Sequence, residues 1–103
     1  MSVYGDWRLV VNSPMGKQHI SVTLRDDGGT LAGVLTNDAN KKTAEIFDGA
    51  VTGDEAQWKV SLQDVKMTMA FDVTATGDSM SGKVKAGRFG RFGVSGQRAA
   101  LNP

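Results

Sequence analysis

The stretch MTMAFDVTATGDSMSGKVKA, residues 67–86, decides the fold of this chain. From Met67 to Ala75, apolar side chains at every second position alternate with smaller or polar ones. A period of two is typical of a β-strand that buries one face and exposes the other. The dipeptide Gly77-Asp78 favours a tight turn, and the same alternation resumes at Met80. The stretch therefore predicts an antiparallel β-hairpin.

The same period recurs on both sides of this hairpin, and glycine- and aspartate-rich turns separate the runs. We expect strands at residues 5–11, 18–25, 30–36, 43–48, 50–53, 56–63, 66–76, 79–86 and 88–98. Short antiparallel strands joined by hairpins form a meander, and a meander that closes on itself leaves no exposed edge. We therefore predict an all-β fold, a single up-and-down antiparallel eight-stranded barrel that forms one domain over residues 1–103.

The composition excludes several classes of site. The chain has 103 residues, no cysteine and one histidine, so disulfides, thiolate zinc sites, cysteine nucleophiles and multi-histidine metal sites are excluded. We expect no metal and no cofactor. No signal-peptide core and no apolar run of membrane-spanning length is present, so we expect a cytoplasmic protein with no membrane partner.

Two features at the ends of the barrel carry a resemblance. Gly5-Asp6-Trp7 opens the first expected strand as G-x-W, and a lone Arg98 closes the last. This pattern resembles calycins, meaning lipocalins and, more loosely, avidins, and the segment TLAGVLT at 30–36 is similar to an avidin strand. The resemblance implies a calycin-like barrel with Arg98 lying across Trp7 at the closed end. The resemblance in strand arrangement extends over the whole chain, but only a few residues match the family's motifs. It therefore implies a fold and no particular ligand.

A calycin-like barrel of this size suggests a binding protein for a small apolar or aromatic molecule. Apolar residues at core positions of three strands would line the site, with a basic residue at the rim for a carboxylate or hydroxyl group. The expected ligand-binding residues are Trp58, Met67, Met69, Phe71 and Met80. An eight-stranded barrel is also narrow enough for side chains to fill its interior. A filled barrel would be a structural or interaction module that works through its outer face.

A small barrel enzyme of the isomerase or cyclase type is the other alternative. Its candidate acid–base groups are His19, Tyr4 and Asp72, although no triad spacing is present. His19 and Asp72 fall on the solvent side of their expected strands. A Tyr4–His19 pair at a barrel rim is the one combination that the sequence suggests.

Charge is distributed unevenly along the chain. Residues 79–103 contain five basic residues and no acidic one, whereas residues 1–78 contain seven basic and eleven acidic residues. The tripeptide Arg88-Phe89-Gly90 repeats as residues 91–93, and basic residues interleaved with aromatic ones occur in single-strand nucleic-acid sites. We expect instead a solvated basic edge that pairs with a partner's acids, and we do not expect nucleic acid as the partner. The sequence leaves open whether the chain forms a homo-oligomer.

Glycines inside the expected strands need a physical reason, because glycine weakens a strand. Gly33 and Gly82 occupy core positions in strands of matching pattern. We interpret them as places where the wall of a tightly coiled barrel bends. The alternative is that they leave room for a ligand.

Overall fold

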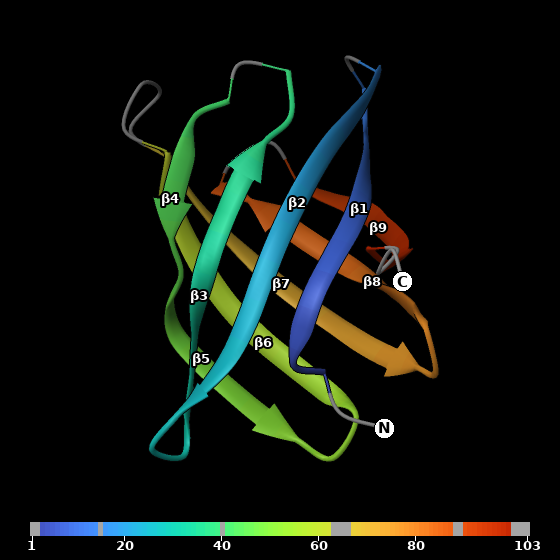
Figure 1. The fold of residues 1–103 in the computed structure, drawn as a ribbon. Helices are drawn as coiled ribbons and strands as arrows, with labels where there is room; N and C mark the ends of the chain where they lie inside the picture. The colour runs from blue at the N-terminus through green and yellow to red at the C-terminus, as the bar shows by residue number, and fades with distance from the viewer. Residues whose placement is uncertain (1–2, 15, 40, 63–66, 88–89, 100–103) are drawn as a thin grey trace.

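The computed structural model describes residues 3–14, 16–39, 41–62, 67–87 and 90–99, and β-strands make up most of them (Figure 1). Nine strand segments follow one another along the chain. Their bounds are β1 Gly5–Ser13, β2 Gly16–Asp27, β3 Thr30–Asn37, β4 Thr43–Glu45, β5 Phe47–Thr52, β6 Glu55–Leu62, β7 Met67–Thr76, β8 Ser79–Ala86 and β9 Arg91–Arg98. Among these residues, no helix is long and apolar enough to cross a bilayer.

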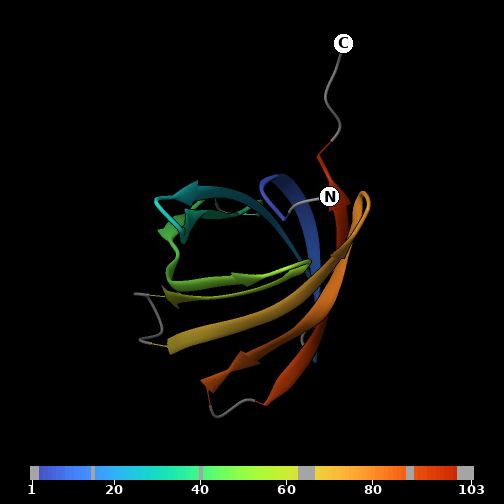
Figure 2. The ribbon, with the colours of Figure 1, turned by 90° about the horizontal axis from the view of Figure 1, so that it is seen from below.

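The strands form one closed antiparallel sheet. Consecutive strands pair with each other except β4 and β5, which both pair with β3. Because β1 also pairs with β9, the first strand meets the last. The pair β2–β3 completes the ring, and Figure 2 shows the strands surrounding one interior. The predicted all-β, up-and-down eight-stranded barrel is therefore confirmed.

Nine segments make eight barrel strands because β4 and β5 are two parts of one interrupted strand. Both pair with β3, and between them the Ile46 N–H still donates to the Gly33 carbonyl at 3.1 Å. We expected the break at Gly49, between strands at 43–48 and 50–53, but the structure places it at Ile46. Asp48 has a positive φ of 51°, and the register shifts between Phe47 and Ala50. This bulge turns the wall at that point.

The interior of the barrel is apolar. Twenty hydrophobic residues are buried, and no polar or charged residue is buried among the described ones. Two tryptophans and Phe71 provide the largest rings, and aliphatic side chains from every wall fill the space between them. The alternation seen in the sequence decides this arrangement, since a one-residue shift would turn a strand's apolar set outward.

Close contacts between neighbouring strands explain the core-facing glycines. Gly33 is the register partner of Leu24, and Gly82 is the register partner of Val73. A Cβ built on Gly82 would lie 2.6 Å from the Val73 Cα and would overlap the carbonyl oxygen of Asp72. These glycines thus let adjacent backbones approach where the wall coils, which favours the bend interpretation over a space for ligand.

Candidate ligand-binding site

The two ends of the barrel differ. The short turns that follow β2, β5 and β7 lie at one end of the barrel, which we call the lower end (Figure 1). The strands β1, β3, β6 and β8 finish at the opposite end, which we call the upper end. At the lower end, the Trp7 indole N–H donates to the Val3 carbonyl at 2.8 Å, and both residues are fully buried. The N-terminal segment therefore covers this end from inside.

Arg98 lies against the same tryptophan. Its guanidinium carbon is 4.3 Å from the centre of the Trp7 ring, and its Nη1 donates to the Tyr4 carbonyl at 2.8 Å. Its Nε lies 3.3 Å from Asp78 Oδ1, an exposed carboxylate in the β7–β8 turn. The register places Trp7 directly opposite Arg98 across the β1–β9 seam. The placement that the calycin resemblance implied for this pair is confirmed.

The upper end has no such cover among the described residues. Met67 and Met69 at the start of β7 and Phe92 at the start of β9 are only partly buried, and Ala44 is their counterpart on β4. The side chains of Ala44, Met69 and Phe92 pack against the main core. Met67 is the first residue of β7, two positions before Met69 on the same face of the strand. The upper end therefore presents an apolar rim in which two of the predicted ligand-binding residues lie.

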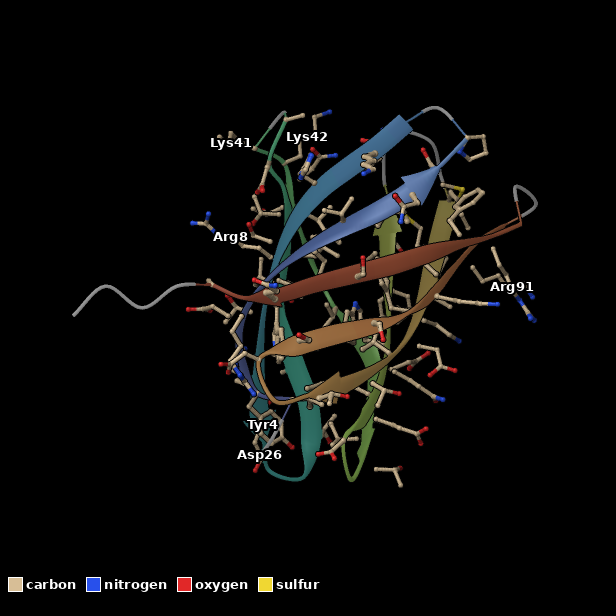
Figure 3. The ribbon with its side chains drawn as sticks, turned by 90° about the vertical axis from the view of Figure 1, so that its right-hand side faces the viewer. Tyr4, Arg8, Asp26, Lys41, Lys42 and Arg91 are labelled. Carbon is tan, nitrogen blue, oxygen red and sulfur yellow. The ribbon has the colours of Figure 1, made fainter. Side chains whose placement is uncertain are left out.

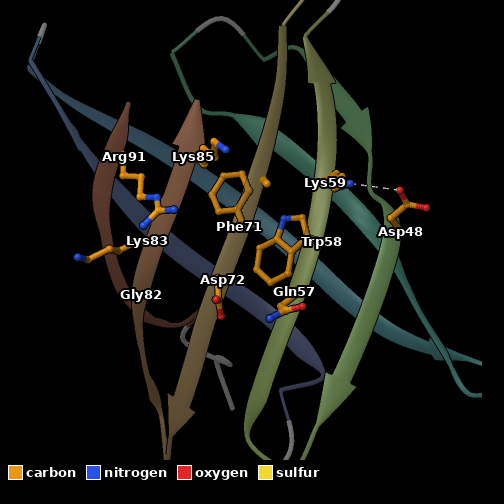
Figure 4. Close-up of a pocket in the computed structure, with 11 residues that line it drawn as sticks. Asp48, Gln57, Trp58, Lys59, Phe71, Asp72, Gly82, Lys83, Lys85 and Arg91 are labelled. Carbon is orange, nitrogen blue, oxygen red and sulfur yellow. Dashed lines mark ion pairs between the residues drawn. The ribbon is translucent and has the colours of Figure 1, made fainter. Parts of the chain in front are cut away.

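Trp58 and Phe71 lie one layer further in. They are register partners on β6 and β7, and their rings stack with centroids 5.2 Å apart at an angle of 14°. Both side chains are buried, so they form the floor below the Met69 position. Figure 4 shows the indole nitrogen on the side of the Trp58 ring that points toward the end of β6.

The indole nitrogen of Trp58 is the unusual atom of this interior. It is buried and has no hydrogen-bond partner among the described residues. An indole N–H can only donate, and a buried donor without an acceptor costs roughly 1–3 kcal/mol. Its counterpart Trp7 has its acceptor at Val3. Trp7, whose N–H has an acceptor, therefore fits a structural role. Trp58, whose N–H has none among the described residues, is the candidate for binding a ligand.

Met80 does not belong to this group. It is buried near the lower end, where its register partners are Ala75 on β7 and Gly96 on β9. The structure thus brings together Trp58, Phe71, Met67 and Met69, and it places the fifth predicted residue in the opposite half of the barrel. Parity alone could not separate them, because parity gives the face of a strand and not the height along it.

The three candidate acid–base residues do not meet. Tyr4 precedes β1 at the lower end, and His19 is exposed near the start of β2, opposite Val10. Five residues of β2 separate His19 from the level of Gly5, about 16 Å at the usual rise per residue. The suggested Tyr4–His19 pair is therefore wrong. Asp72 is exposed on the outer wall of β7, away from both, as its parity indicated.

Among the described residues, shallow depressions open on the outer wall, and two of them are considered because polar side chains border them. The smaller one lies beside Arg8 and His19 on β1 and β2. The larger one crosses β6 to β9 and is bordered by four cations and two carboxylates (Figure 4).

A row of side chains on that wall was not predicted from the sequence. Phe47, Lys59, Ala70, Lys85 and Arg91 are register partners in turn across β5 to β9, so they form a straight outer row. Phe47 is the most exposed large hydrophobic side chain described. Arg88 and Phe89, which the repeat singled out, fall outside the described residues. The row depends on strand register, and the sequence offered no signal for it.

The chain matches no protein-family model, and neither a curated protein nor a solved structure gives a match. No group of three or more histidine, aspartate or glutamate side chains that could hold a metal ion occurs among the described residues. The candidate function therefore depends on the geometry of the upper end and of the outer wall.

Proposed function

We propose that this protein is a calycin-like binding barrel that takes up a small, mostly apolar molecule at its upper end. The ligand packs against Met67, Met69 and Phe71, and a hydrogen-bond acceptor on it meets the indole N–H of Trp58. The observation that carries the proposal is this N–H, which is buried in an apolar interior without an acceptor among the described residues. A ligand carbonyl, ether or carboxylate oxygen would satisfy it.

The chemistry of the rim supports entry at this end. Methionine side chains are unbranched and adaptable, so they can move aside for a ligand and then repack against it. Met67 and Met69 are partly exposed and lie above the Trp58–Phe71 pair. The ligand therefore displaces methionine side chains rather than filling a preformed cavity. The lower end, sealed by Trp7 and Arg98, stays unchanged.

The first prediction concerns ligand-dependent stability. Fatty acids, steroids, small aromatic molecules and biotin are added in a thermal-unfolding assay. At 100 times its dissociation constant, a true ligand adds about 2.7 kcal/mol to the free energy of unfolding. For a domain of this size the melting temperature then rises by on the order of 10 °C. A panel without any shift contradicts the proposal and favours the filled barrel that works through its outer face.

Trp58→Phe separates the hydrogen bond from the packing, because phenylalanine keeps a ring but has no N–H group. The variant is expected to bind the best ligand of the panel about tenfold more weakly, the share of one hydrogen bond. Met80→Leu is the matched control, since it changes a buried side chain in the opposite half. Equal loss of affinity in both variants would indicate a general loss of packing, and an unchanged Trp58→Phe affinity would remove the polar contact from the proposal.

A further inference from the structure

We propose that the outer wall of β8 and β9 contains a second binding site, for phosphate, formed by Lys83, Lys85 and Arg91. This site is separate from the apolar rim, because its side chains point away from the barrel interior. All three are exposed, and they border the larger outer depression. Its ligand class is inorganic phosphate or the phosphate group of a small monoester.

Strand register brings the three cations together. Lys85 lies directly opposite Arg91, and such cross-strand Cβ atoms are about 5 Å apart. Lys83 is two positions earlier on the same face of β8, about 7 Å along the strand. Figure 4 shows Arg91 extending from β9 toward β8, with Lys83 and Lys85 leaving β8 on opposite sides. All three side chains are long and flexible, so a rotation of Lys85 about its side-chain bonds would bring its ammonium group to the same anion.

The charges at this point are not neutralised within the described chain. No carboxylate of the described residues lies within 4 Å of the charged nitrogen atoms of these three cations. Asp48 pairs with Lys59 instead, and Asp78 pairs with Arg98 at the lower end. Asp72 faces Lys83 across the β7–β8 ladder without forming such a pair. Like charges placed opposite each other, as in Lys85 and Arg91, destabilise a sheet. A bound anion would remove this repulsion.

The shape of the wall suits a compact oxyanion. Ala70 lies opposite Lys85, and Gly93 lies opposite Lys83, so two of the neighbouring positions have almost no side chain. The wall is therefore low on the β7 side of Lys85 and on the β9 side of Lys83, which lets an anion approach the sheet beside the cations. A guanidinium group binds two phosphate oxygens with its planar fork, and two ammonium groups supply compact charge for the rest.

The distribution of charge over the whole barrel directs anions to this side. Six carboxylates gather at the lower end, on the turns and the adjacent strand ends. They are Asp6, Asp26, Asp27, Asp54, Glu55 and Asp78. Figure 3 shows Asp26 at this end and Lys41 and Lys42 at the other. An approaching anion is therefore repelled from the lower end and attracted toward the upper part of the wall, where Lys85 and Arg91 lie.

The test titrates the protein with sodium phosphate and with glycerol 3-phosphate, with sodium chloride at equal ionic strength as the reference, and follows backbone amide shifts by NMR. We expect saturable shifts on β8 and β9 that chloride does not produce. Lys85→Gln and Arg91→Gln should each weaken phosphate binding about fivefold or more. Arg25→Gln, which removes an exposed cation from β2, should change it less than about twofold.

Asp72→Asn adds a result in the opposite direction, because removing the nearby negative charge should tighten phosphate binding. Melting curves confirm that each exposed variant folds. The proposal is overturned if phosphate acts like chloride, or if Arg25→Gln loses as much affinity as Arg91→Gln. It is also overturned if a single-stranded oligonucleotide binds to this wall while phosphate and glycerol 3-phosphate do not, since the wall would then be a polyanion surface.

Discussion

Gly96→Ala is expected to destabilise the barrel by about 3 kcal/mol or more, the largest effect among the substitutions considered. Gly96 faces Leu9 across the β1–β9 seam, where the barrel closes. A Cβ at this position would overlap the carbonyl oxygen of Arg8 and lie 2.7 Å from the Leu9 Cα. These are backbone atoms, so no side-chain rotation relieves the overlap. Alanine fits only if β1 moves away from β9.

Gly93→Ala on the same strand is the matched control. The nearest atom to a Cβ there is the Asn12 side-chain nitrogen at 3.9 Å, and its φ lies outside the left-handed region. Alanine therefore fits, and it reduces the entropy of the unfolded chain, so the change should range from neutral to about 1 kcal/mol stabilising. Chemical denaturation of both variants measures the difference. Similar free energies of unfolding would mean that the seam is loose enough to absorb a methyl group.

The glycines show how much of the contact between strands could be predicted from the sequence. Parity singled out Gly33 and Gly82 as bends, and both make the close backbone approach that a bend requires. Gly96 makes the same approach toward Leu9. The spacing of three between Gly90, Gly93 and Gly96 predicts a bulge or bend at one of them or more. The sequence does not say which one, because the distance between two strands depends on their relative twist. That twist is a property of the closed sheet and not of one strand.

The alternation predicted the strands and the barrel, but it could not predict relations between strands. The break at Ile46 depends on the positive φ of Asp48. Aspartate tolerates this conformation, but the presence of an aspartate does not by itself predict it. The separation of Met80 from Met69 needs the height of each residue in the ring. The N–H of Trp58, which has no acceptor in the described part of the chain, and the cation cluster of β8 and β9 can likewise be recognised only when the register is known.

Arg98→Ala is expected to reduce the free energy of unfolding by about 2–4 kcal/mol. The guanidinium group is partly buried over the Trp7 ring, and its hydrogen bond to the Tyr4 carbonyl holds the segment that precedes β1. A desolvated cation–π contact contributes about 2 kcal/mol, and a charged hydrogen bond adds to it. The contact to Asp78 adds little, because that carboxylate is exposed. The first and last strands thus lose a common anchor.

Two further variants make this prediction specific. Arg98→Lys should recover only part of the loss, since an ammonium group cannot stack as a plane on an indole. Arg91→Ala, an exposed arginine on the same strand, should cost less than about 0.5 kcal/mol. Urea denaturation gives the energies, and the near-ultraviolet circular dichroism of Trp7 reports whether the lower end opens. Small and equal effects at Arg98 and Arg91 would mean that the stacked arginine does not hold the barrel closed.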